Sequence, residues 1–481
     1  MRKTISTWIA GWQTGILLVL LATVTSCSKT SNSGGGPVAQ FVSFSFPTGI
    51  NKIPVPSQAT IQGTDVSIFL PPGTNTSALI ATFKVSGNGT VAVNGKVQQS
   101  GTTPNDFSSP VTYTVTSPGG VAQIYTVTVT TGIGAIDQGV AAFMTQYHVP
   151  GLAIAITQND RLVYINAYGM ASVENNEPVT NQSLFRISSL SKQITSVAIL
   201  RLVDQKRLNL DASVFGPAGI LGTTYGTQPY SPGVMKITVN ELLHHTEGGW
   251  PDNSTDPFGS NFSYSIPQLV SWGLNNVPLL DTIPGRSYYY SHFGYVVLGR
   301  VIEKVTGLSY SDAIQQLVLQ PCGISDMKIG GDILANRFAN EVEYYGQNGN
   351  DPYFIPISRM DAANGWIASA TDLARFLSHV DGMSPNTILS PNSVNVMTTG
   401  SYPNPKYGCG WQLNQYNIWH HGSWPGTGAT QAITTQNGNF NYVILANSGS
   451  GNVNFNSDMD NIFWNAVNQV QNWPAYDLFQ Q

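Results

Sequence analysis

Charged residues are scarce in this chain of 481 residues. Lys, Arg, Asp and Glu together make up 10% of it, against about 25% in an average soluble protein. The formal net charge is −5, and no stretch interleaves basic with aromatic residues. A nucleic-acid partner needs a basic surface. The composition therefore excludes this class of partner.

Cysteine is nearly absent, with three residues in the whole chain. So few cysteines exclude a fold stabilised by a framework of disulfides. Cys27 belongs to the N-terminal targeting segment described below, which leaves Cys322 and Cys409. In an oxidising compartment these two can pair, but nothing in the sequence brings them together. We expect two buried free thiols.

Histidine is also rare, and the seven histidines match no spacing found in zinc enzymes. His420 and His421 are adjacent. In a strand, adjacent side chains point to opposite faces, so this pair is poorly suited to bind one metal ion. The sequence predicts no metal site and no cofactor.

Long apolar runs are missing, and the N-terminus carries only a short one. Arg2 and Lys3 precede an apolar run at residues 16–22, which is too short to span a bilayer. This arrangement is typical of a signal peptide, which we assign to residues 1–26. The small residues before Cys27 resemble the bacterial lipoprotein signal, which implies cleavage before Cys27 and lipid attachment there. The alternative is ordinary secretion in which Cys27 has no role.

Residues 27–37 contain three consecutive glycines and almost no apolar side chains. Such a composition favours a flexible tether between a lipid anchor and the folded part of the chain. We therefore expect an exported bacterial lipoprotein, held at the membrane in the periplasm or at the cell surface.

Residues 38–132 have the period-two alternation of β-strands. The alternation is clearest at residues 111–116 and 124–130, which a Ser-Pro-Gly-Gly turn joins as a hairpin. We expect a small all-β, immunoglobulin-like sandwich. It resembles modules near the amino termini of bacterial surface lipoproteins, which implies a stalk or, alternatively, a module that binds glycan or protein.

Ser189 and Lys192 form the motif on which the functional prediction rests. Residues 190–203 are apolar at helical spacing over most of the circumference, which predicts a buried helix. A serine and a lysine three residues apart share one helix face. Burial lowers the pKa of a lysine, which can then accept the serine proton. Ser188, four residues before Lys192, is an alternative on spacing alone.

Residues 136–475, which we assign to one domain, resemble the serine hydrolase family of class C β-lactamases, DD-peptidases and related esterases. Five motifs of that family occur in order, at residues 185–192, 237–246, 284–295, 365–374 and 420–426. Five ordered motifs are far more specific than one, and the first selects Ser189 over Ser188. The resemblance implies an α/β (α+β), β-lactamase/transpeptidase-like fold. In it, an antiparallel sheet is assembled from both ends of the domain, with a helical subdomain between them.

The resemblance also implies a role for a tyrosine in the second motif. Tyr290 aligns with the family's catalytic tyrosine, and Tyr288 and Tyr289 are neighbouring alternatives. A tyrosine beside Lys192 is expected to be partly ionised and to act as general base toward Ser189.

The third motif lies on a strand near the C-terminus. His420 stands where many relatives carry lysine, and Gly422 is the glycine that allows close approach. The resemblance places the oxyanion hole at the backbone N–H groups of Ser189 and Ser423. Which of His420 and His421 faces the cleft stays open at this point.

The chain departs from the family at the end of the second motif. Relatives usually carry an asparagine that binds the substrate amide, whereas this chain has His292. Histidine cannot offer the paired donor and acceptor of an amide. Position 292 therefore weakens the expectation of efficient β-lactam or peptide turnover and favours ester or unusual amide substrates.

Three functions remain open from the sequence. The first is an exported serine hydrolase that forms a covalent acyl-enzyme on Ser189 with an ester, D-amino peptide or β-lactam. The second is a penicillin- or cell-wall-peptide-binding protein or sensor with little turnover. The third is a glycan- or protein-binding surface lipoprotein that uses the hydrolase domain as a scaffold.

Overall fold

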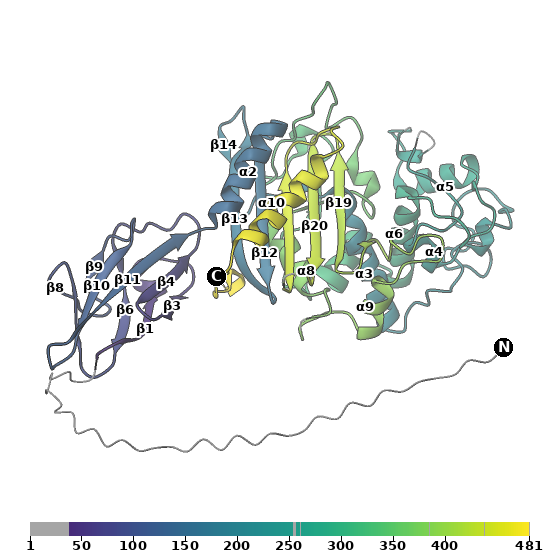
Figure 1. The fold of residues 1–481 in the computed structure, drawn as a ribbon. Helices are drawn as coiled ribbons and strands as arrows, with labels where there is room; N and C mark the ends of the chain where they lie inside the picture. The colour runs from purple at the N-terminus through teal and green to yellow at the C-terminus, as the bar shows by residue number, and fades with distance from the viewer. Residues whose placement is uncertain (1–37, 254–255, 260, 384, 437, 481) are drawn as a thin grey trace, which may run out of the picture.

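The computed structural model describes residues 38–480, apart from residues 254–255, 260, 384 and 437. The predicted signal peptide and tether, including Cys27, lie outside the described residues. Figure 1 shows an all-β part at the N-terminal end and a larger mixed α/β part that follows it.

The N-terminal part consists of short strands packed around aromatic side chains. Its elements are β1 (Phe41–Phe46), α1 (Thr48–Asn51), β2 (Ser57–Gln58), β3 (Thr60–Gln62), β4 (Asp65–Leu70), β5 (Leu79–Ile80), β6 (Thr82–Val85), β7 (Thr90–Val93), β8 (Lys96–Val97), β9 (Pro104–Asn105), β10 (Val111–Thr116) and β11 (Ala122–Thr131). They form sheets in the orders β2-β1-β6, β3-β4-β11-β10-β7-β8 and β5-β9. The predicted hairpin is confirmed, because β10 and β11 pair antiparallel from Thr116 and Ala122 onward.

A seven-stranded sheet forms the centre of the larger part. Its strands are β12 (Gly151–Gln158), β13 (Arg161–Ser172), β14 (Glu177–Pro178), β18 (Gln412–Leu413), β19 (Asn417–Trp424), β20 (Thr427–Thr434) and β21 (Phe440–Ala446). The order is β14-β13-β12-β21-β20-β19-β18. Strand β12, from the start of the domain, pairs antiparallel with β21, from its end. The predicted assembly of one sheet from both ends is confirmed.

Helices cover both faces of this sheet (Figure 1). Helices α2 (Gly134–Tyr147) and α10 (Phe455–Gln469) pack on one face through an apolar cluster that includes Ile136, Phe463 and Tyr442. Helices α3 (Ser191–Asp204) and α8 (Ala370–Ser378) lie on the other face, in the larger apolar core. Because α3 is enclosed by these layers, nearly all of its side chains are buried.

A helical region is inserted between the two halves of the sheet. Its helices and turns are η2 (Val234–Lys236), α4 (Val239–Leu243), η3 (Pro257–Gly259), α5 (Ile266–Asn276), α6 (His292–Thr306), α7 (Tyr310–Ile314), η4 (Gln315–Leu319), η5 (Leu334–Asn336), η6 (Ile357–Met360) and α9 (Pro391–Met397). A small sheet, in the order β15 (Phe185–Arg186), β17 (Trp366–Ala368) and β16 (Lys328–Ile329), lies beside α3. The turns η1 (Ser188–Leu190) and η7 (Leu478–Gln480) complete the described elements.

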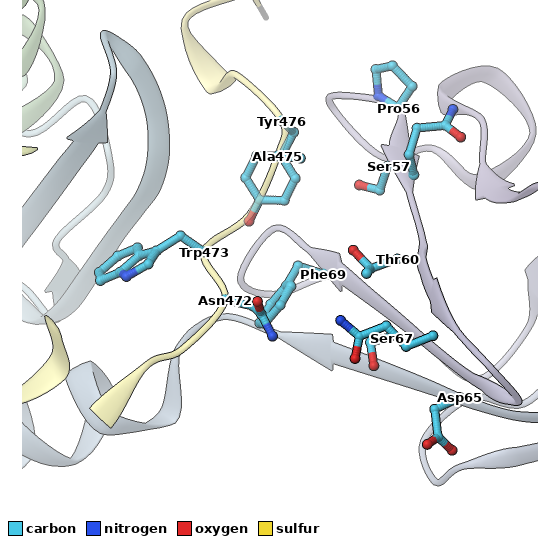
Figure 2. Close-up of a pocket in the computed structure, with 12 residues that line it drawn as sticks. Pro56, Ser57, Thr60, Asp65, Ser67, Phe69, Asn472, Trp473, Ala475 and Tyr476 are labelled. Carbon is cyan, nitrogen blue, oxygen red and sulfur yellow. The ribbon is translucent and has the colours of Figure 1, made fainter. Parts of the chain in front are cut away.

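A groove separates the N-terminal part from the C-terminal segment that follows α10. Figure 2 shows Trp473 and Tyr476 on one side of it and Thr60 and Phe69 on the other. Its volume is about 130 Å³, whereas sites for drug-sized ligands usually enclose about 300–1,000 Å³. The groove is therefore too small for a ligand of that size.

Cys322 and Cys409 are both buried and both free, as the sequence predicted. Burial raises the pKa of each thiol to about 12. Neither side chain is a thiolate nucleophile under ordinary conditions.

Candidate active site

The turn that carries Ser189 joins strand β15 to helix α3. Ser188 has φ +48°, a left-handed conformation that a residue other than glycine rarely adopts. The chain then makes the short turn η1, so helix α3 begins at Ser191, two residues later than a helix starting at Ser189 would. Ser188 Oγ donates a hydrogen bond to the carbonyl of Ser423, 2.9 Å away. Ser188 thus fastens the turn to strand β19, and Ser189 faces Lys192.

Ser189 and Lys192 meet in a largely buried site, in which Ser189 keeps 7% of its surface exposed. Lys192 Nζ lies 3.2 Å from Ser189 Oγ and also donates to the carbonyl of Ala363, at 3.1 Å. Lys192 has no solvent-exposed surface. Burial lowers its pKa to about 7, against the opposing effect of Asp252 and Asp256. The lysine is therefore poised to exchange a proton near neutral pH.

Asn364, which the sequence did not single out, contacts both members of this pair. Its Oδ1 accepts a hydrogen bond from Ser189 Oγ at 3.1 Å and another from Lys192 Nζ at 3.3 Å. The family motif begins at the next residue, Gly365, and a lone asparagine in a loop carries no signal of its own.

Tyr290 lies where the second motif placed it, just before helix α6. Lys192 Nζ is 4.8 Å from the centre of its ring. Burial raises the pKa of Tyr290 well above its usual value, which outweighs the lowering effect of the nearby Ser189 hydroxyl. The partly ionised tyrosine predicted from the sequence is therefore wrong, because an enclosed site disfavours the phenolate. Tyr290 Oη makes no well-formed hydrogen bond within the described part of the chain.

His292 is the first residue of helix α6 and contacts two carboxylates that the sequence did not single out. Its Nδ1 lies 3.2 Å from an oxygen of Asp252 and 3.1 Å from one of Asp256. The possible ligand atoms of these three side chains lie within 4.8 Å of one another. The hydrogen bonds of His292 already account for this arrangement, and we assign no metal to it. Burial raises the pKa of Asp252, but His292 and Lys192 together lower it by more. The pKa of Asp252 is therefore below its usual value, and the carboxyl group is ionised.

His420 lies on the side of β19 that faces Tyr290, where the sequence places the cleft. It belongs to a buried chain of hydrogen bonds. The N–H of Ser291 donates to His245 Nδ1, so His245 Nε2 carries the hydrogen and donates to Tyr407 Oη, 3.2 Å away. Tyr407 Oη in turn donates to His420 Nε2 at 3.2 Å. Burial lowers the pKa of His420 to about 3. His420 is thus a neutral group with a fixed tautomer, inferred from its partners.

His421 points away from the cleft, toward helix α10. Its Nε2 lies 2.8 Å from an oxygen of Asp460, which also accepts a hydrogen bond from Thr430 on strand β20. The ambiguity left by the sequence is thereby resolved: His420 is the histidine on the cleft side of β19, and His421 is on the helix side.

Strand β19 runs directly beside the turn that carries Ser189. A Cβ atom at Gly422 would lie 2.3 Å from the carbonyl oxygen of Ile187, so only glycine fits there. Ser423 follows on the exposed side of the strand, opposite Gly428. The expected oxyanion hole at the N–H groups of Ser189 and Ser423 stays a prediction.

Solved structures share this fold. The D-amino acid amidase from Ochrobactrum anthropi SV3, complexed with D-phenylalanine, superimposes with a TM-score of 0.57 and 22% identity. The match covers 70% of this chain and 99% of the amidase. At this identity the likeness concerns the fold alone.

Curated sequences are similar over the same region. The chain is 27% identical over 332 residues to penicillin-binding protein 4 of Amycolatopsis lactamdurans, a match that covers 62% of this chain and 83% of that protein. It is 26% identical over 308 residues to penicillin-binding protein 4* of Bacillus subtilis, covering 57% of this chain and 63% of that protein. The chain therefore spans less than two thirds of the second relative.

Two family models match, in adjacent parts of the chain. Residues 42–129 match the model described as SGBP, N-terminal. Residues 136–463, more than half of the chain, match the model described as beta-lactamase. This second match contains Ser189, Lys192, Tyr290 and the third motif at His420. The chain belongs to the beta-lactamase family of serine hydrolases.

Proposed function

We propose that this protein is an exported serine hydrolase that forms a covalent acyl-enzyme on Ser189. The observation that carries the proposal is the 3.2 Å contact between Ser189 Oγ and Lys192 Nζ, because that lysine is wholly buried. With the pKa of Lys192 lowered to about 7, a large fraction of the side chain is neutral near pH 7 and can accept a proton.

In the proposed reaction, Ser189 Oγ attacks the substrate carbonyl carbon and its proton passes to Lys192 Nζ. The developing oxyanion accepts hydrogen bonds from the backbone N–H groups of Ser189 and Ser423. Lys192 lies over the ring of Tyr290, which is neutral and makes no well-formed hydrogen bond in the described structure. Lys192 passes the proton on to Tyr290 as Tyr290 gives its own proton to the leaving group. Water then attacks the acyl carbon and gives its proton to Tyr290 as Tyr290 passes its own proton to Lys192, and Lys192 protonates Ser189 Oγ as the acyl bond breaks.

The charges around the site support a substrate that carries no carboxylate beside the scissile bond. His420 is neutral, whereas many relatives have a lysine at that position. Asp252 and Asp256 place negative charge beside Lys192 and His292. An anionic β-lactam or peptide carboxylate would meet these carboxylates, and the neutral His420 would give it no charge to pair with. We therefore propose uncharged or cationic esters and amides as substrates.

The proposed location at the cell envelope rests on the N-terminal sequence. No helix in the described part of the chain is long and apolar enough to cross a bilayer. A lipid on Cys27 would supply the anchor. Cys27→Ala should move the protein from the membrane fraction to the soluble fraction, and unchanged membrane association would count against the lipid.

Replacement of the nucleophile tests the proposed function directly. Ser189→Ala should abolish ester turnover and labelling by a fluorophosphonate probe, read by intact mass and peptide mapping. Ser188→Ala is the matched control, because Ser188 faces strand β19, and it should still be labelled. A label on Ser188 or Ser191, or full activity in Ser189→Ala, would overturn the proposal.

His292→Asn tests the proposed substrate class. An asparagine offers both a donor and an acceptor to a substrate amide, so amide and cephalosporin turnover should rise relative to ester turnover. We expect a change in that ratio of about tenfold, the size of a single specificity contact. A wild-type enzyme that already prefers a cephalosporin to a neutral ester would contradict the assignment.

A further inference from the structure

Asn364 is held against the nucleophile by a rigid piece of backbone. The carbonyl of Ala362 accepts a hydrogen bond from Thr195 Oγ1 at 2.7 Å, and the N–H of Trp366 donates to Ser191 Oγ at 3.2 Å. The carbonyl of Ala363 accepts from Lys192. The segment is therefore bound to helix α3 on both sides of Asn364, whose side chain is 2% exposed. These contacts fix the backbone from which the buried Asn364 side chain reaches Ser189.

Asn364 Oδ1 has a different role when Lys192 is charged and when it is neutral. A charged lysine has three N–H groups, and the site offers three acceptors: Ser189 Oγ, the Ala363 carbonyl and Asn364 Oδ1. In that state the hydroxyl proton of Ser189 has Asn364 Oδ1 as its acceptor. The serine proton then points away from the base, and Ser189 is not activated.

Loss of one proton from Lys192 changes this arrangement. The two remaining N–H groups keep the Ala363 carbonyl and Asn364 Oδ1, and the lysine lone pair becomes free to accept the Ser189 proton. Asn364 Oδ1 therefore accepts the Ser189 proton while Lys192 is charged. Once Lys192 is neutral, Asn364 Oδ1 accepts a hydrogen bond from Lys192 alone. Within the described part of the chain, the other side of the Asn364 amide makes only a weak contact, with Met360 Sδ at 3.8 Å.

We propose that Asn364 is a positioning residue that holds the Ser189 proton away from the charged form of Lys192 and orients Lys192 once it is neutral. This inference rests on the proposed function and deepens it. According to this proposal, Asn364 helps to set the pH above which Ser189 becomes reactive. The Ser–Lys motif alone does not determine that pH.

Two substitutions of Asn364 should move the acidic limb of activity in opposite directions. Asn364→Asp places a carboxylate against the ammonium group, favours the charged lysine and should move the limb to higher pH by about 1–3 units. Asn364→Leu has nearly the same size but no acceptor, so it favours the neutral lysine and should move the limb to lower pH. The measurement is the rate of fluorophosphonate labelling of Ser189 against pH, which needs no turnover, together with kcat/KM for a neutral ester.

The other groups around Lys192 stay the same in both variants. They come from every element packed around it and comprise His245, Asp252, Asp256, Tyr290, His292, Tyr295 and His420. Opposite shifts can therefore be attributed to position 364. Asn441→Leu, at a buried asparagine of β21 that bonds Asp381, is the matched control and should leave the limb in place. If Asn364→Leu does not fold, Asn364→Ala removes the same acceptor with a smaller side chain.

The outcomes separate this inference from the proposed function. Opposite shifts with Ser189 labelled in both variants would support it. Equal losses of rate at every pH, with the limb unmoved, would show that Asn364 is only a packing residue and would overturn the inference, while Ser189 remained the nucleophile. Persistent labelling and turnover in Ser189→Ala would instead sink the proposed function itself.

Discussion

The N-terminal part and the hydrolase domain differ in where their charged side chains lie. Every charged residue between positions 38 and 131 is exposed, namely Lys52, Asp65, Lys84, Lys96 and Asp106. The hydrolase domain instead buries arginines, carboxylates and a lysine. Burying an ion costs several kcal/mol unless it is paired. The described N-terminal part therefore bears no such cost, whereas the buried ions of the hydrolase domain need an explanation.

Most of those buried ions are compensated by a partner of opposite charge or by carbonyl groups. Arg300, for example, lies 2.6 Å from Asp361, and Arg186 donates to the carbonyls of Pro352 and Gly331. Lys192 also has only neutral acceptors and forms no ion pair with any carboxylate that the structure describes, but unlike an arginine a buried lysine readily loses its proton. Burial lowers the pKa of Lys192 to about 7, whereas an arginine keeps its proton in a folded protein.

Lys192→Met should produce the largest effect, by making the site resemble the charge-free core of the N-terminal part. Turnover should fall by about 10⁴-fold or more, because Ser189 and Lys192 act as one proton-transfer unit. At the same time the free energy of unfolding at pH 7 should rise by about 1–4 kcal/mol, since an unpaired buried charge is removed. Activity assays and denaturant unfolding measure the two effects.

The pH dependence of stability provides the control for this variant. Lys192 has a pKa of about 7 in the folded protein against 10.5 as its ordinary value. Between these values the unfolded chain binds the proton that the folded protein has released, so this lysine makes stability rise with pH. The slope over that interval should be smaller in Lys192→Met. An unchanged slope would mean that Lys192 stays charged in the folded protein.

Tyr290→Phe should have the next largest effect on activity. The change removes only a hydroxyl that has no well-formed hydrogen bond in the described structure, so stability should be unchanged or slightly higher. Turnover should fall by about 10²–10³-fold, as expected for a lost proton donor. A lower melting temperature together with the loss of activity would indicate that the packing of the ring, rather than the hydroxyl alone, had been disturbed.

Removal of the N-terminal part should have the smallest effect. A chain that begins at Gly134, the first residue of helix α2, should keep its ester turnover within about twofold of the full chain, because distant and independent parts contribute additively. Assays of both proteins at equal concentration measure this. A soluble but inactive fragment would show that the N-terminal part contributes to the site, and the contrast between the two parts would fail.

The sequence predicted the parts of the site that depend on local order along the chain. Ser189, Lys192 and Tyr290 stand in short motifs, and strand β12 and strand β21 follow from alternation and a turn signal. Their positions in the structure agree with those motifs. Local pattern is sufficient where a residue's role follows from its neighbours in sequence.

The missed residues depend on contacts between distant segments. Asn364 meets Ser189 across 175 positions, and Asp256 meets His292 across 36, so no periodicity connects them. The prediction that Tyr290 is partly ionised was wrong for a related reason. Its pKa depends on how completely other segments exclude water, and that property is absent from the motif itself.

Asp460 has a consequence for the assembly of the sheet. It binds His421 of β19, Thr430 of β20 and Tyr442 of β21 from a single position on helix α10. A slip of β19 by one residue would send His421 into the cleft and turn His420 toward the helix. The three hydrogen bonds of Asp460 thus stabilise the register of β19 that also places His420 beside Tyr290. Refolding of Asp460→Ala should accordingly leave a larger soluble but inactive fraction. An unchanged yield of active protein would argue against this role of Asp460.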